Sequence, residues 1–343
     1  MKQIRLYSGL LLSLSLVFAS CSSSSDDSGN PGDGGDDNPP TGITPPTAQA
    51  FNNLREAALD GLTQTSNHNV TLGNGITFTS PESGTKFILS AGLLAHQSNA
   101  GFQGEAELEF VELYDKADML ITGFDTMGKN ESGSLEMLTS GGVFSVKILN
   151  KENGDPLKLP TGAGGQLTSG YRLEVPQALA GGLISNLGLW FGQYEGGSLI
   201  WEKPEDAGSI STTVDQYWMQ SVKQEHFGWS SVSKIYDTSN NKTTFKANVP
   251  TGYNAENSAV YLSFEGENSA LARLSAFENK TFSQPLISKG KNCQVIFVSE
   301  FEGKWVYAIK SATITEGGSV TFETSDLKTA TQAELVTKLN ELP

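Results

Sequence analysis

The chain has 343 residues, 37 of them glycine, and a formal net charge of −15. This length exceeds a single compact sandwich and predicts two domains with flanking tails. The acidic balance, without any cluster of Lys and Arg, excludes a nucleic-acid partner, because phosphate binding requires a basic surface.

Residues 1–20 have the pattern of an export signal. Lys2 and Arg5 form a positive start, and the apolar run that ends at Phe18 is too short for a membrane span, which needs about 20 apolar residues. The small residues before Cys21 are similar to the lipobox of bacterial lipoproteins, which implies cleavage there and acylation of the cysteine. The alternative is an ordinary signal peptide that leaves Cys21 as a free thiol. The first interpretation predicts a lipid anchor in the outer membrane, with the membrane as the partner of the acyl chains.

Residues 21–46 are rich in Ser, Asp, Gly, Asn and Pro and almost lack apolar side chains, which predicts a disordered acidic tether. Acids soon after the cysteine resemble a pattern that accompanies export to the outer surface in some Gram-negative lipoproteins. A short helix is predicted over residues 47–65, capped by Thr47 and apolar on one face, and we expect it to lie against the first sandwich.

Residues 66–205 have the rhythm of short strands and turns, which predicts a first antiparallel β-sandwich. In the stretch 104–110, the residues Glu105, Glu107 and Glu109 alternate with apolar residues, as in a half-buried strand. The apolar phase then shifts by one position, which predicts a β-bulge or a strand that changes neighbours. A second strand, residues 143–148, closes this region.

A family resemblance rests on four segments: 84–89, 104–108, 141–146, and the pair Leu189-Trp190-Phe191 with Trp201-Glu202. Their order resembles the ZU5-type β-sandwich, in particular the version of cartilage intermediate layer proteins and of bacterial surface lipoproteins. The resemblance covers well under half of the chain. It implies a non-catalytic interaction module.

Residues 213–324 contain further short strands separated by Gly-containing turns, which predicts a second antiparallel β-sandwich. A C-terminal helix is predicted within residues 325–343, where Thr331 and Glu334 have the spacing of a capping box. Together with the first sandwich and the two terminal helices, this makes the predicted fold all-β.

Residues 115–140 form the longest irregular insertion expected within the first sandwich. Met119 to Met127 on this insertion is one candidate binding segment. The other interpretation, which we favour, is that its three consecutive apolar residues close the end of the sandwich, because their exposure would be costly in water. Cys293 lies in an apolar run and is predicted to be a buried, inert thiol.

The sequence contains no pattern that predicts an enzyme. His68, His96 and His226 are far apart and outside any ligand-spaced motif, so we predict no metal site and no cofactor. The pair Glu107 and Glu109 has the spacing of a solvated strand face rather than of a glycosidase acid pair.

The five tryptophans are the candidate ligand-binding residues: Trp190, Trp201, Trp218, Trp229 and Trp305. Aromatic faces on a sandwich can stack sugars, but tryptophans in strands more often belong to a core. Three hypotheses follow. The first is a non-catalytic cell-envelope lipoprotein that acts as an adhesion, scaffold or interaction module with envelope proteins or glycans. The second is a glycan-binding accessory of a polysaccharide uptake system, and the third is a hydrolase with an unrecognised site.

Overall fold

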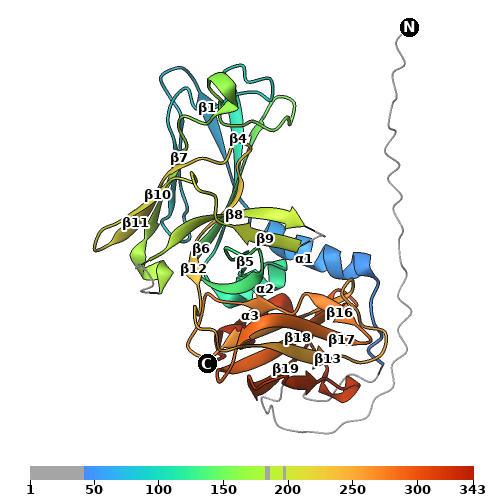
Figure 1. Ribbon diagram of the computed structural model, residues 1–343. Helices are drawn as coiled ribbons and strands as arrows, with labels where there is room; N and C mark the ends of the chain where they lie inside the picture. The colour runs from blue at the N-terminus through green and yellow to red at the C-terminus, as the bar shows by residue number, and fades with distance from the viewer. Residues whose placement is uncertain (1–41, 182–185, 196–197) are drawn as a thin grey trace, which may run out of the picture. The chain divides into compact units, whose positions relative to one another are not determined.

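The computed structural model describes residues 42–181, 186–195 and 198–343 (Figure 1). The predicted signal peptide, Cys21 and residues 21–41 of the tether lie outside the described residues. The described chain is all-β, with two antiparallel β-sandwiches, an N-terminal helix and a C-terminal helix, as the sequence predicts. No helix within these ranges has the length and the apolar content needed to cross a membrane.

The first sandwich consists of two sheets formed by described residues between 64 and 235. In order, the larger sheet contains β1 (Gln64–Val70), β4 (Gly104–Leu113), β6 (Leu135–Asn150), β12 (Gly228–Ile235), β8 (Gly188–Glu195), β9 (Ser198–Glu202) and β5 (Met127–Lys129). The smaller sheet contains β10 (Ser209–Thr212), β11 (Gln216–Val222), β7 (Tyr171–Pro176), β3 (Lys86–Leu89) and β2 (Ile76–Thr79). Both sheets bury apolar side chains such as Phe87, Phe110 and Leu173 between them.

Part of the larger sheet closes on itself. The short strand β5 pairs antiparallel with β6 and also pairs in parallel with β9, where Gly128 lies opposite Trp201. Because β9 pairs with β8, β8 with β12 and β12 with β6, these strands form a closed ring. Residues 127–129, within the insertion expected to be irregular, are therefore the element that completes the ring.

The second sandwich is formed by strands between residues 242 and 330. One sheet contains β16 (Ala276–Glu278), β17 (Thr281–Ser288), β13 (Lys242–Asn248) and β20 (Ser319–Thr321). The other contains β15 (Ala272–Arg273), β14 (Ser258–Phe264), β18 (Asn292–Phe301), β19 (Lys304–Thr313) and β21 (Lys328–Ala330). Phe245, Val260, Phe297 and the thiol of Cys293 lie in the core between them, and burial raises the pKa of that thiol to about 12. Cys293 is thus a free, buried cysteine, as predicted.

The predicted boundary between the sandwiches, with segments 66–205 and 213–324, is wrong. Strands β10, β11 and β12 belong to the sheets of the first sandwich, so the second begins with β13 at Lys242. The segment 325–343 assigned to the C-terminal helix also contains the strand β21, which precedes the helix α3 (Gln332–Asn340). Alternating burial identifies a strand but not the sheet that it joins, which explains the first error.

The two terminal helices begin at the predicted caps. The Thr47 side chain accepts a hydrogen bond from the Ala50 N–H at 3.2 Å at the start of α1 (Ala48–Leu62). Thr331 and Glu334 form the predicted capping box of α3, in which the Thr331 N–H donates to the Glu334 carboxylate at 2.7 Å. Such caps satisfy backbone N–H groups that have no partner within the helix.

A second apolar cluster joins both sandwiches with the helices. Phe51 of α1 is fully buried and meets the ring of Trp305 from the second sandwich edge-on, with 6.2 Å between centroids. The helix α2 (Lys116–Thr122) adds Met119, Leu120 and Ile121, all buried in this cluster. The expected burial of these three residues is confirmed. They pack between the sandwiches, however, and do not close one end of the first sandwich. Helix α1 also contacts the second sandwich, rather than the first alone.

Polar contacts cross the same junction. The Lys242 ammonium lies 3.4 Å from the Glu136 carboxylate, and both side chains are largely buried. The Lys116 ammonium donates to the Leu342 carbonyl at 2.9 Å. The junction therefore combines a shared apolar cluster with an ion pair and a hydrogen bond between its two halves.

The phase shift after Phe110 has a different cause from the one expected. Strand β4 pairs with β6 in unbroken register from Ala106 to Leu113, so there is no bulge. Val111 and Leu113 are buried because the cluster with α1 and α2 covers the second face of β4 at this end. A strand covered on both faces loses the alternation that a half-buried strand shows.

Asp125 is a buried carboxylate within this junction. Burial raises its pKa from 3.8 to about 6, against the opposing attraction of Arg273 and Arg55 and a hydrogen bond from the Met127 N–H. The folded chain binds this proton more tightly than the unfolded chain. The stabilising contribution of the protonated form is therefore complete below pH 3.8 and is lost as the pH rises through 6.

We therefore expect Asp125→Asn to raise stability relative to the native chain at pH 7.5, with a difference that shrinks toward pH 4. Asparagine keeps an oxygen for the Met127 N–H, which donates to Asp125 Oδ1 at 2.9 Å, and removes only the charge. Urea unfolding midpoints of the two proteins at both pH values measure this difference. A stability difference that stays the same at both pH values would contradict the raised pKa of Asp125.

Candidate functional site

Four of the five candidate tryptophans are buried. The exposed fraction is 4% for Trp190, 1% for Trp201, 8% for Trp229 and 0% for Trp305. These four therefore belong to the core, which is the more frequent role of tryptophans in strands, and they cannot act as open stacking faces, because a stacked sugar needs an accessible ring face. These rings fill the cluster between the sandwiches and the interior of the ring of strands.

Trp218 is the exception. It is half-buried on the outer face of the smaller sheet, in register with Glu174 of β7 and Ser211 of β10. Glu174 is paired there with Arg172, at 2.6 Å, and with Lys86, at 3.7 Å. Trp218 thus stands in register with a residue that belongs to a cluster of charged side chains.

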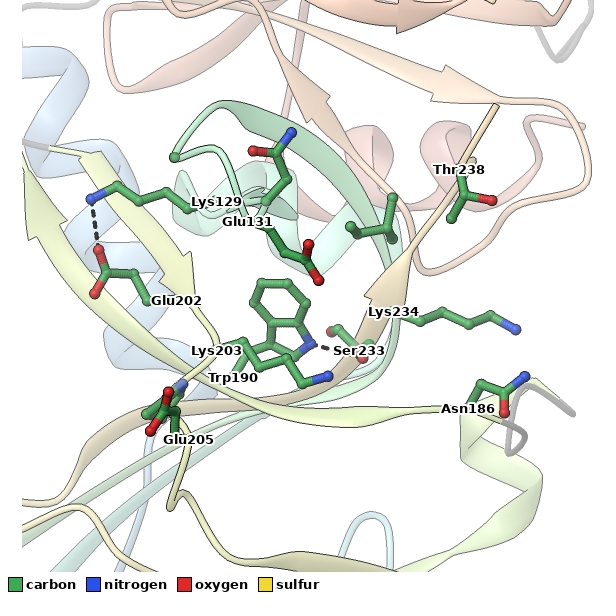
Figure 2. A pocket seen from close by; sticks show the side chains of 14 residues that line it. Lys129, Glu131, Asn186, Trp190, Glu202, Lys203, Glu205, Ser233, Lys234 and Thr238 are labelled. Carbon is green, nitrogen blue, oxygen red and sulfur yellow. Dashed lines mark hydrogen bonds and ion pairs between the residues drawn. The ribbon is translucent and has the colours of Figure 1, made fainter. Parts of the chain in front are cut away.

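A cleft of about 960 Å³ lies at the mouth of the ring of strands. It is lined from β5, β8, β9 and β12 and from the connections next to them, by Lys129, Asn130, Glu131, Gly133, Asn186, Trp190, Glu202, Lys203, Pro204, Glu205, Ser233, Lys234, Ile235 and Thr238 (Figure 2). The volume is within the range of small-molecule pockets, and the mouth of a closed sheet is a common place for one.

The floor of the cleft is held by the ring itself. The indole N–H of Trp190 donates to the Ser233 carbonyl at 2.8 Å, from β8 to the neighbouring β12, as Figure 2 shows. Because the hydrogen bond joins two paired strands, the indole has a fixed orientation. Only an edge of Trp190 reaches the cleft, since the ring is 4% exposed.

One wall of the cleft is fixed by an ion-pair cluster. The Lys129 ammonium of β5 donates to Glu202 of β9 at 2.6 Å and also pairs with Glu195 of β8. The two carboxylates raise the pKa of Lys129, which keeps the lysine charged. The cluster ties β5 to β9 beside their single backbone pairing, Gly128 with Trp201.

The turn from β5 to β6 forms the upper rim. The Asn130 side-chain oxygen accepts hydrogen bonds from the Ser132 N–H and from the Ser134 N–H, both at 3.0 Å. The Asn130 amide also donates to Glu136 at 2.5 Å. This turn is therefore ordered by its own side chain, and it presents Glu131 to the cleft (Figure 2).

Several predicted site residues lie elsewhere. Cys21 is outside the described residues. Within the described ranges, no group of three or more His, Cys, Asp or Glu side chains is placed to hold a metal ion. The segment Met119 to Met127 is largely buried in the junction and does not line the cleft.

The sequence did not reveal this cleft because its lining comes from three separate parts of the chain: β5 with the turn after it, the consecutive strands β8 and β9, and β12. The sequence offers only a weak indication of the cleft. Lys129 and Lys234 lie within strands, Lys203 directly follows one, and acidic residues stand near each of them. No protein-family model matches this chain, and no curated protein matches its sequence.

Proposed function

We propose that this protein is a non-catalytic, lipid-anchored binding module of the bacterial cell envelope, held at the outer membrane. The export signal, Cys21 at its end, and the acidic tether that follows support the anchor. Several acyl chains on one cysteine hold a protein stably on a membrane, where a single chain would be marginal.

The observation that carries the binding role is the cleft at the mouth of the ring. It has a volume of about 960 Å³, and paired strands, an ion-pair cluster and a self-ordered turn hold its lining in place. A binding site on rigid elements loses little conformational entropy when its ligand enters. The resemblance to ZU5-type sandwiches also supports an interaction module. Its segments fall in strands β3, β4, β6, β8 and β9 of the first sandwich.

A glycan-binding accessory is the second candidate function. The cleft supports this function. The group of five tryptophans does not, because four of them are buried. Polar side chains around a small apolar floor are a common arrangement for sugar recognition. The third hypothesis, a hydrolase, has no specific observation in its favour.

A photo-crosslinking amino acid at position 131 tests the binding role. Glu131 is exposed on the rim of the cleft, so the replacement should not disturb the fold. In intact cells, we expect irradiation to give a discrete adduct from this position. The control is the same replacement at Glu256, an exposed position on a loop of the second sandwich, which should give none. Equal labelling from both positions, or none from position 131, would contradict a binding role for the cleft.

A further inference from the structure

We propose that the cleft at the mouth of the ring binds an uncharged, hydroxyl-rich ligand, a short segment of a neutral oligosaccharide. This assignment rests on the proposed binding function and specifies its ligand class. Four features of the cleft support it: the balance of charge, the side chains without internal partners, the apolar floor and the short length of free strand edge.

The charge balance of the lining argues against a strongly charged ligand. Lys129, Lys203 and Lys234 contribute three positive charges, and Glu131, Glu202 and Glu205 contribute three negative charges, so the lining sums to zero. The whole chain carries −15, so the neutrality of the cleft is local. A polyanion or a polycation would find repulsive charges beside the attractive ones.

Three exposed groups in the lining make no hydrogen bond or ion pair with other described residues: Glu131, Lys203 and Glu205. Each carboxylate can accept from two hydroxyls, and the ammonium of Lys203 donates to hydroxyl oxygens. Every sugar hydroxyl both donates and accepts one or more hydrogen bonds. A mixed set of free acceptors and donors therefore matches a polyol better than it matches a purely anionic or cationic group.

The floor supplies a small apolar surface. Its apolar lining residues are Trp190, Pro204 and Ile235, of which Pro204 and Ile235 are half-buried. The side chain of Lys203 adds its methylenes, because it lies close over the backbone of Gly188, where a Cβ would come within 2.9 Å of Lys203 Cε. The C–H face of a sugar ring suits such a patch.

A peptide that binds by adding a strand finds only short stretches of free strand edge here. Among the strands that line the cleft, β5 pairs with β6 and β9, β8 with β9 and β12, and β12 with β6 and β8. Strand addition requires an edge with unpaired N–H and C=O groups. One backbone pair, Gly128 with Trp201, closes the ring between β5 and β9, so only short stretches of these two strands stay unpaired and recognition depends mainly on side chains, as it does for sugars.

The test uses the full chain with Cys21→Ser, which removes the acylation site, and isothermal titration against defined probes. The neutral probes are the hexasaccharides of cellulose, xylan, mannan and amylose. The charged probes are hexamers of galacturonic acid and of glucosamine. We expect at least one neutral hexasaccharide to bind and neither charged hexamer to bind more tightly.

Variants then locate the binding. The double change Glu131→Ala with Glu205→Ala should weaken the neutral ligand about tenfold or more, since each lost hydrogen bond contributes about 0.5–1.5 kcal/mol. Trp218→Ala, on the outer sheet face, should leave the affinity unchanged. Thermal melts of the variants establish that they are folded, which the exposure of both glutamates predicts.

Three outcomes would overturn the assignment: no binding of any neutral probe, tighter binding of a charged hexamer, or loss of binding with Trp218→Ala instead of the glutamate variant. A protein adduct from position 131 in cells, combined with no sugar binding, would retain the proposed binding function and reject only the ligand class. Release of new reducing ends from a bound probe would instead contradict the non-catalytic function.

Discussion

Gly192→Ala is expected to lower the free energy of unfolding by about 1–3 kcal/mol, the usual cost of overpacking a core. A Cβ at this position would lie 2.8 Å from the Cβ of Trp229 and 2.9 Å from Cδ1 of Leu199. The Leu199 tip can rotate away, but the Trp229 Cβ moves only with the backbone of β12. The ring of strands would therefore have to open, or β8 would have to shift within it.

Urea unfolding followed by tryptophan fluorescence measures this effect. The matched control is Gly73→Ala, because a Cβ at Gly73 meets nothing within 4 Å and its φ angle is not in the left-handed region. That change should be neutral or slightly stabilising, since alanine reduces the entropy of the unfolded chain. If Gly192→Ala changed the free energy of unfolding no more than Gly73→Ala does, the proposal that Gly192 is closely packed inside the ring would be contradicted.

Local features of the fold could be predicted from the sequence. The caps at Thr47 and Thr331 appear where the spacing of polar and apolar residues places them. The alternation of Glu105, Glu107 and Glu109 with apolar residues identifies the outer and inner faces of β4. Each of these signals lies within a few residues, which is why periodicity reveals them.

The features that depend on distant pairing could not be predicted. Strand β12 has the pattern of any half-buried strand, and only its pairing with β6 and β8 places it in the first sandwich. The three-residue strand β5 is too short for periodicity to identify. Because β5 closes the ring, the cleft at its mouth also remained hidden from the sequence.

The burial of the tryptophans also could not be predicted from local sequence patterns. An alternating pattern cannot tell whether the second face of a strand meets solvent or another layer. Trp201 and Trp305 face the junction between sandwiches, and α1 and α2 cover part of that junction. Their burial is thus a tertiary property, and Trp218 differs from them because it remains half-buried among the described residues.

Cys21→Ser is expected to move the protein from the membrane fraction to the soluble fraction of the cell envelope. Serine has no thiol for thioether formation, so the acyl chains that the proposed anchor requires cannot be attached. The change lies at the first residue of the predicted tether and outside the described residues, so the melting temperature of the folded domains should not change. Ser22→Ala, one residue away, is the matched control and should remain in the membrane fraction.

Mass spectrometry of the mature N-terminal peptide, taken from the membrane fraction, tests the lipid anchor most directly. If Cys21 carries the proposed lipid anchor, the mature chain begins at Cys21 and its mass is increased by a diacylglyceryl group. Where the N-terminus is also modified, a further acyl chain adds to this mass. Two results would contradict the lipid anchor. One is a mature chain that begins at another residue; the other is a chain with an unmodified thiol at Cys21, recovered from the soluble fraction.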